Sequence, residues 1–163
     1  MTDRFYTGIG SRKTPKNILD HMSFIALFLD KRNYTLRSGG APGADQAFGG
    51  GSLHKDIYTT KDVPDWAMKM VQKYIPKDLK VPFEKFAPHT KLLLARNMMQ
   101  VLGYEGNAKS DFIVYWAPIC DINSVEIGGT GYAVRCAIDY GIPTYNLNKS
   151  NELKDFISFL RTV

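Results

Sequence analysis

Residues 34–48 read YTLRSGGAPGADQAF, and this stretch decides the fold. Its first residues, Tyr34 to Leu36, favour an extended backbone and predict a short strand. The residues from Ala44 onward return to a helical spacing. Between them lie three glycines that permit positive φ angles and a close approach to the backbone, namely Gly39, Gly40 and Gly43. A helix that begins after such a turn directs free N–H groups outward, so the stretch predicts a site for a phosphate or carboxylate.

The turn matches neither of two familiar phosphate-binding motifs. No Gly-Lys-Ser/Thr follows it at the spacing of a P-loop, and its glycines do not fit G-x-G-x-x-G. A tight connection between a strand and a helix, without any ligand, explains a single turn of this kind equally well. Other features of the sequence are needed to distinguish a ligand-binding turn from a connection that binds nothing.

The expected elements alternate between strand and helix along the chain. Apolar and β-branched runs predict strands at residues 4–9, 34–36, 56–58, 112–116 and 144–146. Helical spacing predicts helices at residues 15–33, 44–48, 65–74 and 90–102, after residue 131 and from residue 151. Thr14 is the expected N-cap of the first helix, with proline next to it. This order predicts one α/β domain over residues 1–163, with a mostly parallel sheet of about five strands.

Composition narrows the class of protein. The 163 residues are 44% hydrophobic and 23% charged, which is typical of a globular domain. No apolar run approaches the roughly 20 residues that cross a bilayer, and the N-terminus lacks a signal-peptide core. Cys120 and Cys136 have no metal spacing and indicate reduced thiols. We therefore expect a cytoplasmic protein without a membrane partner.

The net charge of +5 is concentrated in one part of the chain. Residues 61–96 hold eight basic and four acidic side chains. Four prolines interrupt residues 60–88, which we interpret as a basic insertion over one edge of the sheet: Pro64, Pro76, Pro82 and Pro88. A basic segment favours an anionic partner, either a nucleotide or a nucleic acid, although a solvated lysine face has the same composition.

Three glycine-rich turns lie beyond the expected strand ends, at residues 8–11, 39–43 and 128–131. Ligands bind at this edge of an open parallel sheet, so three such turns favour a binding site. Asp45 can accept hydrogen bonds from ribose hydroxyls, or it can simply stabilise the N-terminus of its helix. Hydroxyl and guanidinium groups near the turns suit phosphate oxygens: Ser11, Ser38, Thr130, Arg12 and Arg37. The expected ligand-binding residues also include the glycines Gly10, Gly39, Gly40, Gly43, Gly128, Gly129 and Gly131.

Other side chains carry less information. Tyr115 or Trp116 can stack on a base, although both also suit the core. The three histidines have no ligand spacing, so we expect no metal, and no cofactor is indicated. No serine lies in a G-x-S-x-G context, which argues against a serine hydrolase.

The motifs Gly10-Ser11-Arg12, Ser38 to Asp45 (SGGAPGAD) and Gly128 to Gly131 (GGTG) resemble the SLOG superfamily. This superfamily includes the DprA (Smf) proteins and the Lonely Guy phosphoribohydrolases. The segments at residues 95–97 and 100–103 look like those of small bacteriophage members, which adds Arg96 and Asn97 to the expected ligand-binding residues. The resemblance implies a Rossmann-like three-layer sandwich and a nucleotide-like ligand.

The chain departs from the Lonely Guy motif P-G-G-x-G-T-x-x-E, whose glutamate is catalytic. Aligned on Gly128 and Gly129, it has Ile127 for the proline, Tyr132 for the threonine and Arg135 for the glutamate. Arginine keeps its proton and cannot act as a base. The catalytic residue is therefore unknown, and the candidate carboxylates are Asp45 and Glu126.

Three hypotheses remain open. The first is a protein that binds, senses or sequesters a nucleotide-derived ligand, and for it we expect Gly40→Val to block binding. The second is an N-glycosidase that acts on a nucleoside monophosphate. The third is a DprA-like protein that binds single-stranded DNA through residues 61–96. Because SLOG relatives often assemble through a helix face, we also expect a homo-oligomer, with residues 91–102 as the candidate face.

Overall fold

The structure is a computed structural model and describes residues 3–163. Its centre is a five-stranded sheet in the order β3-β2-β1-β4-β5, in which every neighbouring pair is parallel. The strands are β1 (Arg4–Gly10), β2 (Tyr34–Ser38), β3 (Lys55–Ile57), β4 (Phe112–Trp116) and β5 (Thr144–Asn146). The expected α/β class and strand number are confirmed, and the sheet is parallel throughout.

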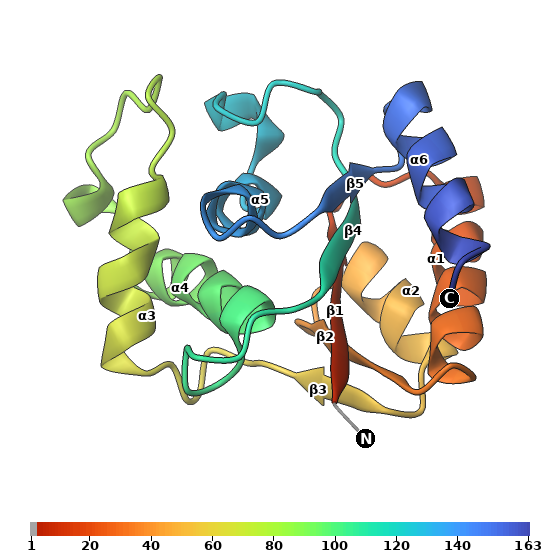
Figure 1. Ribbon diagram of the computed structural model, residues 1–163. Helices are drawn as coiled ribbons and strands as arrows, with labels where there is room; N and C mark the ends of the chain where they lie inside the picture. The colour runs from red at the N-terminus through yellow and green to blue at the C-terminus, as the bar shows by residue number, and fades with distance from the viewer. Residues whose placement is uncertain (1–2) are drawn as a thin grey trace.

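Helices cover both faces of the sheet and complete a three-layer sandwich (Figure 1). One layer contains α1 (Lys16–Asp30), α2 (Ala44–Gly51) and α6 (Ser150–Leu160). The other contains α4 (Pro88–Leu102) and α5 (Thr130–Asp139). The remaining helices are α3 (Asp65–Met70) and three short 3₁₀ helices, η1 (Val71–Tyr74), η2 (Phe83–Lys85) and η3 (Val125–Ile127).

The two faces of the sheet bury different side chains. Beneath α1, α2 and α6 the core is rich in aromatic rings, including Tyr6, Phe48, Phe112 and Phe156. Beneath α4 and α5 it is mostly aliphatic and thioether, including Met98, Ile113 and Val134. Every residue of β4 is buried, as its continuous apolar sequence predicts for a strand covered on both faces.

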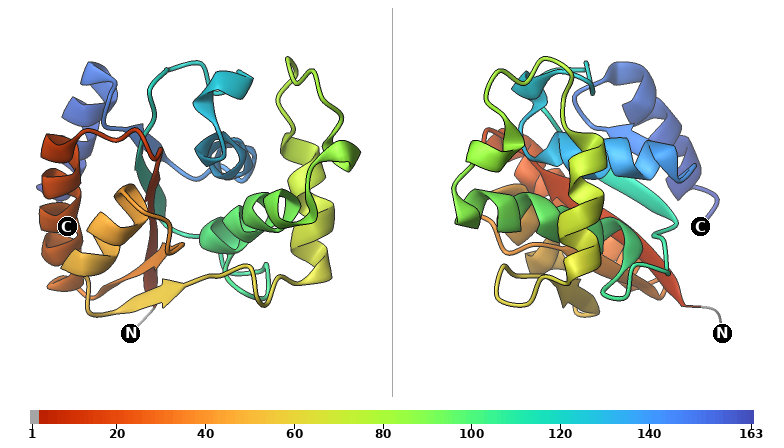
Figure 2. Two further views of the ribbon diagram at one scale, coloured as in Figure 1. Left: turned by 180° about the vertical axis from the view of Figure 1, so that it is seen from behind. Right: turned by 90° about the vertical axis from the view of Figure 1, so that its left-hand side faces the viewer.

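The inserted segment lies elsewhere than we expected. α3 and η1 pack on α4 and α5 as an additional layer, rather than over an edge of the sheet (Figures 1 and 2). The reason is that Ala67, Val71 and Tyr74 bury their side chains in the core of α4 and α5. The expected helix over residues 65–74 is also shorter, because it changes to a 3₁₀ helix at Val71.

Two further details correct the expectations. Pro15, and not Thr14, is the N-cap of α1, because the Thr14 hydroxyl donates to the carbonyl of Ser11 (2.5 Å). Part of the proposed assembly face at residues 91–102 is buried within the chain. Met98, Met99 and Leu102 of α4 are at most 1% exposed and cannot meet a second copy.

Within residues 3–163, no helix has the length and apolar character needed to cross a membrane.

Candidate functional site

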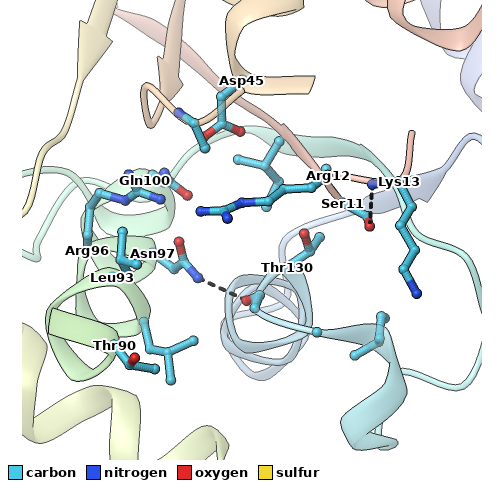
Figure 3. Close-up of a pocket in the computed structure, with 17 residues that line it drawn as sticks. Ser11, Arg12, Lys13, Asp45, Thr90, Leu93, Arg96, Asn97, Gln100 and Thr130 are labelled. Atoms are coloured by element: carbon cyan, nitrogen blue, oxygen red, sulfur yellow. Dashed lines mark hydrogen bonds between the residues drawn. The ribbon is translucent and has the colours of Figure 1, made fainter. Parts of the chain in front are cut away.

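A cleft of about 350 Å³ opens at the carboxyl ends of the strands (Figure 3). It lies between the turn after β1, the N-terminus of α2, one face of α4 and the turn that leads into α5. Its lining includes nine residues that the sequence predicts as ligand-binding: Gly10, Ser11, Arg12, Asp45, Arg96, Asn97, Gly128, Gly129 and Thr130. The fold therefore brings together residues that are up to 120 positions apart, from Gly10 to Thr130.

Five of the predicted site residues do not line the cleft: Ser38, Gly39, Gly40, Gly43 and Gly131. The Ser38 hydroxyl is fully buried and donates to the carbonyl of Gly8 (2.6 Å), so it joins two strands. Gly39 lies beneath the cleft, where an added Cβ would come within 2.5 Å of Asp45 and 2.8 Å of Arg96. The missing side chain of Gly39 thus leaves the space that the Asp45 and Arg96 side chains occupy.

Asp45 is the carboxylate of the cleft. It is 6% exposed, and its Oδ2 accepts a hydrogen bond from the N–H of Ala41 (3.3 Å). Burial raises the pKa of Asp45 to about 6, and the nearby Arg96 guanidinium offsets part of that rise. A buried carboxylate that is ionised near neutral pH strongly favours a ligand that donates hydrogen bonds to it.

Two guanidinium groups converge on the middle of the cleft. Figure 3 shows Arg12 reaching across it from the turn after β1 toward Arg96 and Gln100 on α4. The pKa of Arg96 is lowered, mainly by burial and further by the like charge of Arg12, whereas Asp45 opposes this shift. In the part of the chain that the structure describes, Nε of Arg96 has no hydrogen-bond partner. Two such cations side by side attract an anion.

Gln100 lines the same cleft and was not among the predicted site residues. Its side chain is 99% buried, and neither amide atom has a hydrogen-bond partner among residues 3–163. Its main-chain oxygen accepts from the Thr7 hydroxyl (2.6 Å), which fixes α4 against β1. The motif that contains Gln100 was visible in the sequence, but only the fold shows which side of α4 faces the cleft.

The N-terminus of α5 forms the opposite wall. Asn97 donates from Nδ2 to the carbonyl of Gly129 (2.9 Å) and holds this turn against α4. An added Cβ at Gly128 would meet no atom within 4 Å, so the turn is open to the cleft. The first turn of a helix can leave N–H groups without partners. Here the N–H groups of Gly131 and Tyr132 donate to the carbonyls of Gly128 (3.1 Å) and Gly129 (3.2 Å). Those of Gly129 and Thr130 therefore remain for a ligand, next to the Thr130 hydroxyl.

Other sequence candidates lie outside the cleft. Arg37 is buried, stacks 3.9 Å above the Phe5 ring and donates to the carbonyl of Ala108, so it does not supply charge to a ligand. Tyr115 and Trp116 are core residues. Glu126 is exposed and does not line the cleft, which leaves Asp45 as the carboxylate there.

Nowhere in residues 3–163 do three His, Cys, Asp or Glu side chains form a group that could hold a metal ion.

Arg135, which the sequence alignment sets against the Lonely Guy glutamate, has a structural role. Its Nε donates to the carbonyl of Tyr74 (2.7 Å) and its Nη1 to the carbonyl of Ile122 (2.6 Å). The guanidinium also lies 4.8 Å from the centre of the Tyr132 ring. Arg135 therefore fastens η1 and the loop after β4 to α5.

Comparison with known proteins shows a likeness in structure only. No family model matches the chain, and no curated protein matches its sequence. Its structure is similar to that of DNA processing protein A from Helicobacter pylori, whose structure was described for its single-stranded DNA binding mode. The TM-score is 0.60 at 20% sequence identity, over 99% of this chain and 80% of that one. The two proteins share a Rossmann-like α/β fold.

Proposed function

We propose that this protein binds a nucleotide or a nucleotide-derived molecule in the cleft. The observation that carries the proposal is the convergence of Arg12 and Arg96 with the N-terminus of α5 at one place. Guanidinium groups and the N–H groups of a helix N-terminus are both strong partners of phosphate oxygens. Because the cleft also holds Asp45 and Gln100, its chemistry suits a ligand with an anionic part and a polar, uncharged part.

The phosphate is placed by this proposal at the α5 end of the cleft. Ser11 and Thr130 offer hydroxyl groups there, and Lys13 adds a cation at the rim. Arg12 is exposed and reaches the middle of the cleft, so it can contact a phosphate without the desolvation that a buried cation would need. At the other end, Asp45 and Gln100 lie farther from the rim, next to Arg96 (Figure 3).

Binding without cleavage is the function that the cleft supports best. Arg135 is engaged with two main-chain carbonyls where the Lonely Guy enzymes have their catalytic glutamate. A sensing or sequestering role, as the resemblance to small bacteriophage SLOG proteins suggests, requires no more than the cleft provides. Asp45 is the remaining carboxylate for an N-glycosidase. Chromatographic detection of free base that disappears in Asp45→Asn would assign hydrolysis to the cleft instead.

Isothermal titration tests the proposal with a panel of nucleoside monophosphates, cyclic nucleotides and ADP-ribose-type molecules. We expect saturable binding, and Arg96→Ala to weaken it by about 1.5–3 kcal/mol because a hydrogen bond to a charged group is lost. Arg161→Ala removes an exposed arginine outside the cleft and serves as the control. No saturable binding across the panel, or equal affinities for the Arg96→Ala and Arg161→Ala variants, would reject the proposal.

Binding of single-stranded DNA is a second candidate, favoured by the structural likeness to DNA processing protein A. The inserted segment supplies exposed lysines, including Lys69, Lys77 and Lys85. Phosphate-mediated binding weakens steeply as the salt concentration rises. A gel shift with single-stranded oligonucleotides therefore decides the matter: a salt-sensitive shift supports this candidate, and no shift at low salt removes it.

A further inference from the structure

We propose that the inner end of the cleft, a base subsite formed by Asp45, Arg96 and Gln100, recognises a guanine-type base. By this we mean a ring edge with two adjacent N–H donors next to a carbonyl acceptor. The inference rests on the proposed function, because it requires a nucleotide in the cleft. It adds which base the nucleotide carries.

The first observation is a set of buried polar groups that no protein atom satisfies. Both amide atoms of Gln100 and Nε of Arg96 lack partners among the residues that the structure describes. A buried polar atom without a partner is unfavourable and is uncommon in folded proteins. All of these atoms belong to residues that line the cleft, and each atom is itself buried, so a ligand with both donors and acceptors satisfies them once the side chains turn toward it.

The second observation is that Asp45 and Arg96 are neighbours without being paired. An added Cβ on Gly39 would touch both the Asp45 carboxylate and the Arg96 guanidinium. The ion pairs found within residues 3–163 nevertheless join other residues, namely Lys16 with Asp20, His54 with Asp30, and Lys149 with Glu152. A carboxylate and a guanidinium set apart in this way suit a group that donates to one and accepts from the other.

Guanine has this combination among the common bases. Its N1–H and N2 amino group are adjacent donors that match the two oxygens of a carboxylate such as that of Asp45. Its O6 and N7 are acceptors that a guanidinium such as that of Arg96 contacts in bidentate fashion. The Gln100 amide can donate to O6 at the same time. Adenine would instead turn its N1 acceptor toward Asp45, and uracil and cytosine each offer a single donor group on this edge.

The positions of the side chains agree with one nucleotide spanning the cleft. Figure 3 shows Asp45, Arg96 and Gln100 at one end and Ser11, Lys13 and Thr130 toward the other. A base at the first end leaves the phosphate at the N-terminus of α5, as the proposed function requires. The volume of about 350 Å³ lies in the range of pockets that take small molecules.

The test is a titration of the full chain with the 5′-monophosphates of guanosine, inosine, adenosine, cytidine and uridine, and with ribose 5-phosphate. We expect guanosine monophosphate to bind roughly 10–100-fold more tightly than the adenosine, cytidine and uridine compounds, because a donor to a charged carboxylate is lost in each. Inosine monophosphate lacks the N2 amino group and is expected to fall between them.

Asp45→Asn provides the sharper test, because it replaces one carboxylate oxygen by a donor. The variant should lose its preference for guanosine monophosphate and prefer xanthosine monophosphate, which has a carbonyl in place of the N2 amino group. Lys13→Ala is the matched control, since Lys13 lies at the phosphate end. It should weaken all nucleotides and ribose 5-phosphate by a similar factor and leave their order unchanged.

The outcomes separate this inference from the proposed function. If all the monophosphates bind within about threefold of one another and Asp45→Asn leaves their order unchanged, base recognition is overturned while nucleotide binding stands. If no monophosphate and no ribose 5-phosphate binds, the proposed function fails as well. A preference that moves from guanosine to xanthosine monophosphate in Asp45→Asn supports both, and it cannot arise from a misfolded variant.

Discussion

Two glycine-rich turns border the cleft, and they use glycine for different reasons. In the turn after β2, a Cβ on Gly39 would collide with Asp45 and Arg96, so the missing side chain makes room for other side chains. In the turn before α5, a Cβ on Gly129 would meet only Leu94, at an ordinary 3.6 Å, and one on Gly128 would meet nothing. The first turn is packed at Gly39, whereas the second is open at Gly128 and Gly129.

The two turns therefore contribute to the cleft in different ways: the first holds side chains in place, and the second leaves its backbone open to a ligand. The packed turn positions a buried carboxylate and a half-buried guanidinium, and it lines the cleft itself only through Ala41. The open turn presents its backbone directly, so a ligand can approach its N–H groups. Both turns look alike in the sequence, but substitution of Gly39 should change stability and binding together, whereas substitution of Gly129 should change binding alone.

The largest effect is expected for the carboxylate that the packed turn holds. Burial raises the pKa of Asp45 to about 6, above its ordinary value of 3.8. Because the folded pKa exceeds the unfolded one, the free energy of unfolding falls as the pH rises from about 4 to about 6. Above that range Asp45→Asn should be more stable than the wild type by about 3 kcal/mol. Urea denaturation at pH 7.5 and pH 4 measures this difference.

At pH 4 the two proteins should be about equally stable, which is the internal control. A stability difference that does not change between the two pH values would contradict a raised pKa for Asp45. The Asp45→Asn substitution is also expected to change the base preference. Asp45 would then lower the stability of the free protein while it contributes to base recognition.

Gly39→Ala should have the next largest effect, on stability and binding together. The new Cβ lies 2.5 Å from Asp45 Oδ2, so both Asp45 and Arg96 must move. Overpacking of this kind costs about 1–3 kcal/mol. Chemical denaturation and nucleotide titration of the same variant check both effects. Wild-type affinity in a folded Gly39→Ala variant would show that the packed turn does not position the cleft.

Gly129→Ala should weaken nucleotide binding without lowering the stability of the fold. Gly129 has an ordinary helical φ of −60°, and its Cβ fits beside Leu94, so stability should change by less than about 0.5 kcal/mol. The methyl group would nevertheless lie where a phosphate approaches α5, so nucleotide affinity should fall. Thermal unfolding and calorimetry on one sample measure the two. An unchanged affinity would remove this turn from the binding site.

Gly40→Val should have the smallest effect, although the sequence led us to expect that it blocks binding. Gly40 does not line the cleft, and an added Cβ there would meet only Ile57, at 3.8 Å. We now expect its affinity for nucleotides to be close to that of the wild type, as measured by titration. A large loss of binding would mean that ligands reach past Ala41 onto this part of the turn.

The fold was predictable because its signals are local. The alternation of apolar runs with amphipathic spacing, and glycine turns between them, determines a parallel sheet covered on both faces. The placement of residues 60–88 was not predictable in this way. It depends on whether Val71 and Tyr74 find a partner on α4 and α5, which is a contact between segments distant in the sequence.

The site was predictable only in part, for a similar reason. The sequence shows that the turns end parallel strands, and therefore that Ser11, Asp45 and Thr130 come together. It does not show which glycine lies under a side chain and which lies open, as Gly39 and Gly129 do. Gln100 was not predicted as a ligand-binding residue, because a glutamine in an apolar helix indicates a ligand only once its amide is seen to be buried and unpaired.

The hydrogen bonds of Arg135 make the inserted segment sensitive to the charge of the residue at position 135. The carboxylate of a glutamate at this position would instead face the carbonyl oxygens of Tyr74 and Ile122. Repulsion between these oxygens would loosen the contact between the inserted segment and α5. The charge of the residue at position 135 therefore decides whether the inserted segment stays docked on α5.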